Sequence, residues 1–167
     1  LLPSTDEYLS TMEVYQEKDV PIKQAVPNET VWLDELKIEF LAPLQFYDTM
    51  NNNSVVVKLT YGDTSFLMMG DAEKEEEKDL LNSGANLQAD VIKIGHHGSK
   101  TSTTQEFLNA VQPDMAVISV GPDKNELPKS EVLQRLEQSN VKTYRTDSSG
   151  TVIFMSDGAD ITVATEQ

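Results

Sequence analysis

A hairpin of two apolar runs, followed by a regular alternation of strands and helices, constrains the fold of this chain most strongly. Ser54–Tyr61 and Thr64–Met69 are predicted strands, and Gly62-Asp63 between them is typical of a tight turn. After an acidic helix from about Glu73 to Leu81, strands are expected at 90–94, 114–120, 141–144, 150–155 and 160–164, with helices at 103–111 and 130–138. A hairpin followed by strand–helix repeats predicts a sheet with helices packed on it, an α/β layered domain.

The first third of the chain predicts a helix, two short strands and a polar loop. Apolar residues recur at helical spacing within Thr5–Asp19, and short strands are expected at Thr30–Leu33 and Leu36–Leu41. Gln45–Asn53 is expected to be a loop. The sequence shows no linker and no internal repeat, so residues 1–167 are expected to form a single domain.

Charge and residue content exclude several classes of site. The chain has no cysteine, which excludes disulfides, thiolate zinc sites and a cysteine nucleophile. Its formal net charge of −15 argues against a general nucleic-acid surface. A bound divalent cation can still supply the positive charge that a phosphodiester substrate needs. No apolar run approaches the ~20 residues of a membrane span, so no lipid contact is expected from this segment.

The two histidines of the chain are adjacent, in Gly95-His96-His97-Gly98, just past a predicted buried strand. Catalytic groups in open α/β sheets commonly lie beyond the carboxyl ends of strands. The flanking glycines free the backbone, so both imidazole rings could turn towards one site. The alternative is a pair of ordinary loop histidines.

Asp71 follows the apolar strand that ends at Gly70, and it precedes the acidic helix. As an N-cap it would accept hydrogen bonds from the next backbone amides; as a metal ligand it could bridge two ions. The acidic residues from Glu73 to Asp79 are interpreted as solvated first turns of the helix, softened by the pairs Lys74–Glu77 and Glu75–Lys78.

Two further polar segments lie next to strands. Asn51-Asn52-Asn53-Ser54 is typical of a turn, or it could contact a substrate or metal. Arg145 could bind an anion, or it could pair with a carboxylate.

The order of these motifs resembles one known family. Asn-Ser before an apolar strand, Gly-Asp, Gly-His-His-Gly-Ser, Ile-Ser-Val-Gly and Arg-Thr-Asp-x-x-Gly occur in this order over roughly Val20 to Met155. The series is similar to the metallo-β-lactamase-like domain of competence (ComEC-like) DNA-internalisation proteins. Asp90–Ser102 is the most specific stretch, and phosphorylcholine esterases of the same superfamily are similar there.

The resemblance implies a two-sheet αββα sandwich that holds one or two metal ions, zinc or manganese, and hydrolyses phosphodiesters. It implies that Asp71 bridges the metals, that His97 is a metal ligand, and that His96 faces the substrate as a catalytic group. Asn53 and Ser99 lie where substrate-binding groups are expected. It also implies an extracytoplasmic location on a bacterial membrane protein, or secretion.

The family's upstream His-x-His-x-Asp-His cluster does not occur in this sequence, which begins at Leu1 rather than at Met. The chain is therefore expected to be the C-terminal half of the domain, and its other partners to be the remainder of the parent protein or a second copy of itself. Alone, it is expected to bind metal weakly and to be inactive. The alternative function is a non-catalytic interaction or regulatory domain that keeps the fold without a complete metal site.

Overall fold

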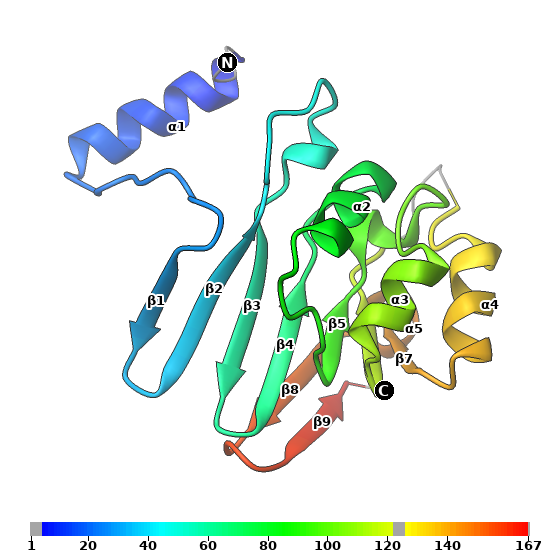
Figure 1. Cartoon of the computed structure of the whole chain (residues 1–167). Coiled ribbons are helices and arrows are strands. Elements are labelled where there is room, and N and C mark those ends of the chain that lie inside the picture. The colour runs from blue at the N-terminus through cyan, green and yellow to red at the C-terminus, as the bar shows by residue number, and fades with distance from the viewer. Residues whose placement is uncertain (1–4, 122–125, 167) are drawn as a thin grey trace.

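A single large sheet organises the molecule. The computed structural model describes residues 5–121 and 126–166. Seven strands pair in the order of the chain, with β1 to β4 antiparallel and β4 to β7 parallel (Figure 1). The strands are β1 (Thr30–Leu33), β2 (Leu36–Ala42), β3 (Val56–Tyr61), β4 (Thr64–Met68), β5 (Val91–Lys93), β6 (Met115–Ile118) and β7 (Lys142–Arg145).

Three helices cover one face of this sheet and enclose the core. They connect the parallel strands and are α2 (Lys74–Asn82), α3 (Gln105–Val111) and α4 (Ser130–Gln138). The β5 residue Ile92 is fully buried between its neighbours Leu67 and Ala116, which are also fully buried. Burying one such aliphatic side chain contributes about 1.5–3 kcal/mol. Thr104 caps α3 by accepting a hydrogen bond from the Phe107 amide at 3.3 Å.

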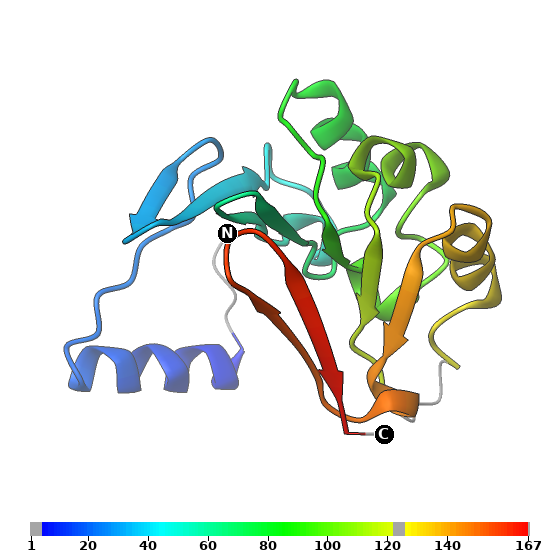
Figure 2. The ribbon, with the colours of Figure 1, turned by 90° about the horizontal axis from the view of Figure 1, so that it is seen from below.

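A second, two-stranded sheet packs on the opposite face (Figure 2). It consists of β8 (Val152–Ser156) and β9 (Ile161–Thr165). Phe154 meets Phe66 and Tyr144 edge-to-face, at centroid distances of 6.3 and 5.6 Å. These ring contacts fix the hairpin to β4 and β7, and the short helix α5 (Thr146–Ser149) leads into it.

The N-terminal part of the chain is far less buried. Helix α1 (Asp6–Glu17) has no buried residue and lies apart from the sheet in both views (Figures 1 and 2). All four residues of the edge strand β1 are exposed, including Trp32 at 61% and Leu33 at 64%. Apolar surface therefore remains uncovered at this edge of the sheet.

The predicted α/β class is confirmed, and the order of elements matches the expectation with bounds shifted by a few residues. Tyr61 pairs with Thr64 across Gly62-Asp63, as the hairpin prediction required. The sequence did not predict α5 or the short 3-10 helices η1 (Asn51–Asn53) and η2 (Gly95–Gly98). The extent of the domain stays a prediction. Within the described ranges, none of the helices has the length and apolar content to cross a bilayer.

Candidate metal and catalytic site

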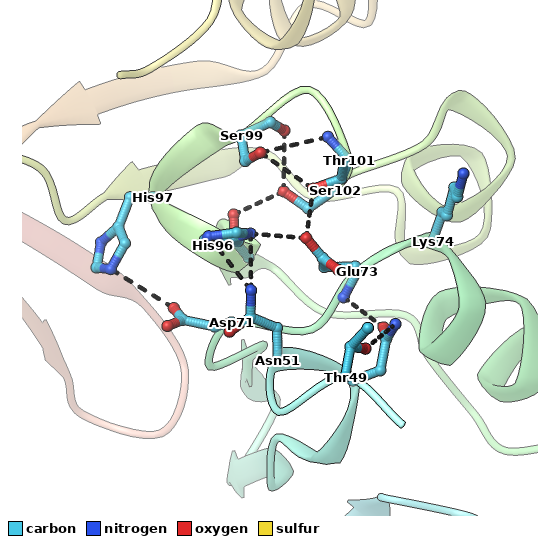
Figure 3. A network of polar contacts seen from close by, with 12 residues as sticks. Thr49, Asn51, Asp71, Glu73, Lys74, His96, His97, Ser99, Thr101 and Ser102 are labelled. Atoms are coloured by element: carbon cyan, nitrogen blue, oxygen red, sulfur yellow. Dashed lines mark hydrogen bonds and ion pairs between the residues drawn. The ribbon is translucent and has the colours of Figure 1, made fainter. Parts of the chain in front are cut away.

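The candidate site lies where two neighbouring parallel strands end. Strands β4 and β5 pair up to Met68 and Lys93, so the segments that follow them emerge at the same rim. One segment carries Gly70-Asp71 and the other carries the η2 histidines. The structure thereby brings together groups more than twenty residues apart in sequence (Figure 3).

An unusual backbone turn presents the two histidines. His96 and His97 have φ angles of 44° and 53°, and Gly98 follows at 78°, so three consecutive residues are left-handed. This conformation costs roughly 1–2 kcal/mol for a residue with a Cβ. Hydrogen bonds hold the turn: the His96 amide donates to the Gly70 carbonyl at 3.2 Å, and the Ser102 hydroxyl donates to the Gly95 carbonyl at 2.8 Å. Strained residues held in this way are typical of functional sites.

The flanking glycines are required by space. A Cβ on Gly95 would lie 2.7 Å from the Ala72 carbonyl oxygen, and one on Gly98 would lie 2.5 Å from the Pro128 side chain. The glycines were expected to supply the backbone freedom of this turn, whereas His96 and His97 themselves also adopt left-handed angles.

His97 is aimed at Asp71. Its Nε2 lies 3.6 Å from the Asp71 Oδ1, and its Nδ1 donates to the Ser119 carbonyl at 2.6 Å. A carbonyl accepts only, so Nδ1 carries a proton, and in the neutral ring the Nε2 lone pair is the group that faces Asp71. Metal-binding histidines commonly have their second nitrogen fixed in this way.

Asp71 itself is not the cap of α2. The N-cap position is Glu73, and the amide groups of Glu73 and Glu76 donate to Oδ1 of Asn52, at 3.0 and 3.4 Å. The Asp71 amide donates to the Ser54 hydroxyl at 2.9 Å, which leaves its carboxylate directed at the rim. Of the two roles considered for Asp71, the N-cap role is wrong, and the role of a metal ligand stays a prediction.

The geometry of this pair fits a shared metal ion. Two ligands of a tetrahedral zinc ion bound at about 2.1 Å lie roughly 3.4 Å apart. The 3.6 Å between Asp71 Oδ1 and His97 Nε2 is close to that separation. Over residues 5–121 and 126–166, however, no group of three or more His, Asp or Glu side chains is arranged to hold an ion.

His96 belongs to a separate polar network. Its Nδ1 lies 3.0 Å from Glu73 Oε1, and the same oxygen accepts the Thr101 hydroxyl at 2.6 Å (Figure 3). The amide nitrogen of Asn51 lies 3.4 Å from both ring nitrogens. Glu73 and Thr101 were not predicted at this site, because only the folded chain brings them to His96; Asn51 belongs to the segment for which a substrate or metal contact was one of two alternatives.

Lys93 is a further group at the rim that the sequence did not single out. Its ammonium donates to the carbonyls of Gly70 and Ile94 at 3.1 and 3.3 Å. Burial lowers the pKa of Lys93, and the Asp71 carboxylate opposes that shift. The lysine therefore ties the ends of β4 and β5 together and places a positive charge near Asp71.

The two residues expected to bind substrate differ in placement. The side-chain amide of Asn53 forms its hydrogen bonds within its own loop. Its oxygen accepts the backbone amide of Tyr47 at 3.0 Å, and its nitrogen donates to the Tyr47 and Thr49 carbonyls at 2.7 Å. The asparagine that reaches the site is Asn51. Ser99 lies at the site and contacts the Thr101 hydroxyl at 3.0 Å.

The acidic helix is not simply solvated, and that interpretation was wrong for two of its residues. Glu76 and Glu77 are buried, at 0% and 1% exposure. Glu77 accepts the amides of Thr103 and Thr104, whereas neither oxygen of Glu76 has a hydrogen-bond partner among residues 5–121 and 126–166. Desolvation, with Asp79 and Glu77 nearby, raises the pKa of Glu76 to about 8.

The structure also shows which ion pairs Lys74 and Arg145 form. Lys74 contacts Glu75 at 3.7 Å rather than Glu77. The Arg145 guanidinium pairs with Asp147 at 2.6 Å, which is the second of the two roles considered for it.

The sequence of this chain is similar to those of known proteins. A family model described as the metallo-beta-lactamase superfamily matches residues 3–121. ComE operon protein 3 of Bacillus subtilis (strain 168) is 37% identical over 154 residues, which are 84% of this chain and 20% of that protein. Competence protein ComA of Neisseria gonorrhoeae is 36% identical over 124 residues, which are 72% of this chain and 18% of that protein. The chain thus spans about a fifth of the length of these relatives.

Among solved structures, CmlA, a diiron beta-hydroxylase from Streptomyces venezuelae, is similar with a TM-score of 0.56. The sequence identity is 11%, over 87% of this chain and 36% of that chain. At this identity the likeness shows the fold alone.

Proposed function

The chain belongs to the metallo-β-lactamase superfamily, and from that premise we propose that it forms part of a metal-dependent phosphodiesterase. Its relatives include named competence proteins, so it is a competence-related domain of this hydrolase fold. The proposed substrate is a DNA strand processed during DNA uptake by the longer protein. The proposed location is the extracytoplasmic face of a bacterial membrane protein, or outside the cell.

One observation carries the proposal: His97 Nε2 lies 3.6 Å from Asp71 Oδ1, while the Ser119 carbonyl holds the proton on His97 Nδ1. The group they would hold is zinc or manganese. A bound divalent ion supplies a water of lowered pKa and neutralises phosphoryl oxygens, which answers the objection raised by a net charge of −15.

The side chains at this rim would have different roles in the reaction. Asp71 and His97 would hold and orient the ion, and the backbone bonds around η2 keep them in place. His96, whose side chain is 28% exposed, would face the phosphodiester and give a proton to the leaving oxygen. Lys93 at the same rim has a third ammonium proton that could be donated to a phosphoryl oxygen, whereas the Ser99 hydroxyl donates to Thr101.

A second candidate is a non-catalytic interaction or regulatory domain, and the ligand count favours it. Asp71 and His97 are two ligands, whereas a catalytic zinc site has three from the protein. The two candidates differ in one respect: only the enzyme needs further ligands from outside the described residues.

The test is hydrolysis of single-stranded and duplex DNA by the full-length protein with manganese or zinc. The proposal predicts metal-dependent cleavage that falls at least 100-fold in Asp71→Asn and in His97→Ala, because each loses a direct ligand. Glu106→Gln is the matched control, because it also removes one negative charge but at an exposed position on α3. This variant should retain activity. Absence of cleavage by the native protein with either metal would favour the non-catalytic domain.

A further inference from the structure

The two adjacent histidines are held by chemically different partners. Nδ1 of His97 faces a neutral main-chain carbonyl, that of Ser119, at 2.6 Å. Nδ1 of His96 faces the carboxylate of Glu73 at 3.0 Å. A neutral carbonyl suits an imidazole that stays neutral as a ligand, whereas a carboxylate also stabilises an imidazolium.

The proton on His96 can be assigned from these contacts. Glu73 Oε1 also accepts the Thr101 hydroxyl at 2.6 Å, and a carboxylate oxygen is an acceptor only. If Nδ1 lacked a proton, two acceptors would face each other at 3.0 Å. Nδ1 therefore carries the proton, and Nε2 has the lone pair when the ring is neutral.

Asn51 leaves that lone pair available. Its amide nitrogen is the same 3.4 Å from Nδ1 and from Nε2. An atom placed symmetrically in the ring plane would overlap the carbon between the two nitrogens, so it must lie over the ring face. Asn51 thus supports the plane of the ring and does not take the in-plane position at Nε2.

Glu73 is itself well fixed. Its side chain is 15% exposed, the Thr101 hydroxyl holds one of its oxygens, and its backbone amide donates to Asn52. The carboxylate is therefore preorganised by contacts from two other segments before any substrate arrives.

We infer that Glu73 is a positioning residue for His96. The Glu73 carboxylate keeps the proton on Nδ1 of His96, so that Nε2 is the ring nitrogen that faces the reacting phosphodiester. This inference rests on the proposed function for its chemistry. In the step, a water oxygen forms a bond to phosphorus as the phosphorus–oxygen bond to the leaving group breaks. The water releases a proton to solvent, and the leaving oxygen takes the Nε2 proton of His96 in its imidazolium form. The ring is left neutral, with its Nδ1 proton still bound to Glu73.

The test is the tautomer of neutral His96, read from the nitrogen-15 shifts of its two ring nitrogens in this chain without metal. The native chain is expected to show Nδ1 protonated and Nε2 unprotonated. Glu73→Ala removes the acceptor, so the proton should move largely to Nε2, the form that a free histidine side chain prefers. Glu73→Gln keeps an acceptor oxygen and should restore the Nδ1 proton. Glu106→Ala, an exposed carboxylate on α3, is the charge-matched control and should leave the tautomer unchanged.

A native His96 with its proton on Nε2, or a tautomer that is the same in Glu73→Ala as in the native chain, would overturn the inference. The His97 signals report folding in the same spectra, since their Nδ1 proton should persist in every variant. This readout needs no catalysis, so failure of the DNA cleavage assay alone would count against the proposed function and leave the positioning role intact.

Discussion

Glu76 is a buried carboxyl group. Within the part of the chain that the structure describes, neither of its oxygens has a hydrogen-bond partner, and Asp79 and Glu77 lie nearby. A charged carboxylate there would be strongly disfavoured, so the group stays protonated at neutral pH. The sequence could not reveal this, because Glu75, Glu76 and Glu77 are identical in type and only their direction on the helix separates them.

Glu76 makes the stability of the chain depend on pH in a defined direction. Its pKa is about 8 when folded, against an ordinary value of 4.5, so folding takes up a proton between these values. The free energy of unfolding should therefore fall as pH rises through that window, by up to about 1.4 kcal/mol per pH unit from this group.

Denaturant unfolding between pH 5 and 8 measures the effect. Glu76→Gln should remove this slope, since an amide does not titrate. Glu75→Gln, whose native side chain is 51% exposed, is the matched control and should retain it. Equal slopes in the native chain and in Glu76→Gln would show that Glu76 is not the proton acceptor.

At the scale of elements, one asparagine joins the loop before β3 to helix α2. Asn52 is 2% exposed. Its oxygen accepts the amides of the N-cap residue Glu73 and of Glu76 in α2, and its nitrogen donates to Thr49 and to Glu75, each at 3.0 Å. It caps the helix from another segment, whereas the sequence suggested a cap from the adjacent Asp71.

Removing this cap should destabilise the chain. Asn52→Ala leaves buried amide groups without partners, and we expect a loss of about 1–3 kcal/mol in the free energy of unfolding. Asn109→Ala, on the exposed surface of α3, should change stability by less than about 0.5 kcal/mol. Urea denaturation of the two variants makes the comparison, and equal effects would contradict the capping role.

The elements also show what local sequence can and cannot predict. Apolar periodicity and the Gly62-Asp63 turn were enough for the strands and helices, since these depend on residues close in the chain. The left-handed turn at His96 and His97 was not predictable, because bonds from Gly70 and Ser102 stabilise it. Asp71 and His97 were predicted from the motif, whereas the contact of Glu73 with His96 was not predictable, because only the folded chain brings these two residues together.

For the whole molecule, the exposed apolar surface predicts self-association. Val31 lies on the sheet face opposite the helices and is 42% exposed, and Leu33 on the same face is 64% exposed. Like charges oppose association of a chain with net charge −15, so it should strengthen as salt screens them.

Sedimentation over a range of protein concentrations at low and high salt tests this. A concentration-dependent rise in mass is expected at high salt, and Leu33→Glu should weaken it, whereas Leu81→Glu, a surface change on α2, should not. A monomer at every concentration in high salt would contradict the prediction.

Isothermal titration of zinc into this chain tests whether Asp71 and His97 form part of a metal site. The structure predicts weak binding, because two protein ligands leave the ion mostly held by water. That binding should be lost in His97→Ala and in Asp71→Ala, and it should persist in His96→Ala, since His96 belongs to the Glu73 network. Tight stoichiometric binding that survives both His97→Ala and Asp71→Ala would show that the metal site lies elsewhere.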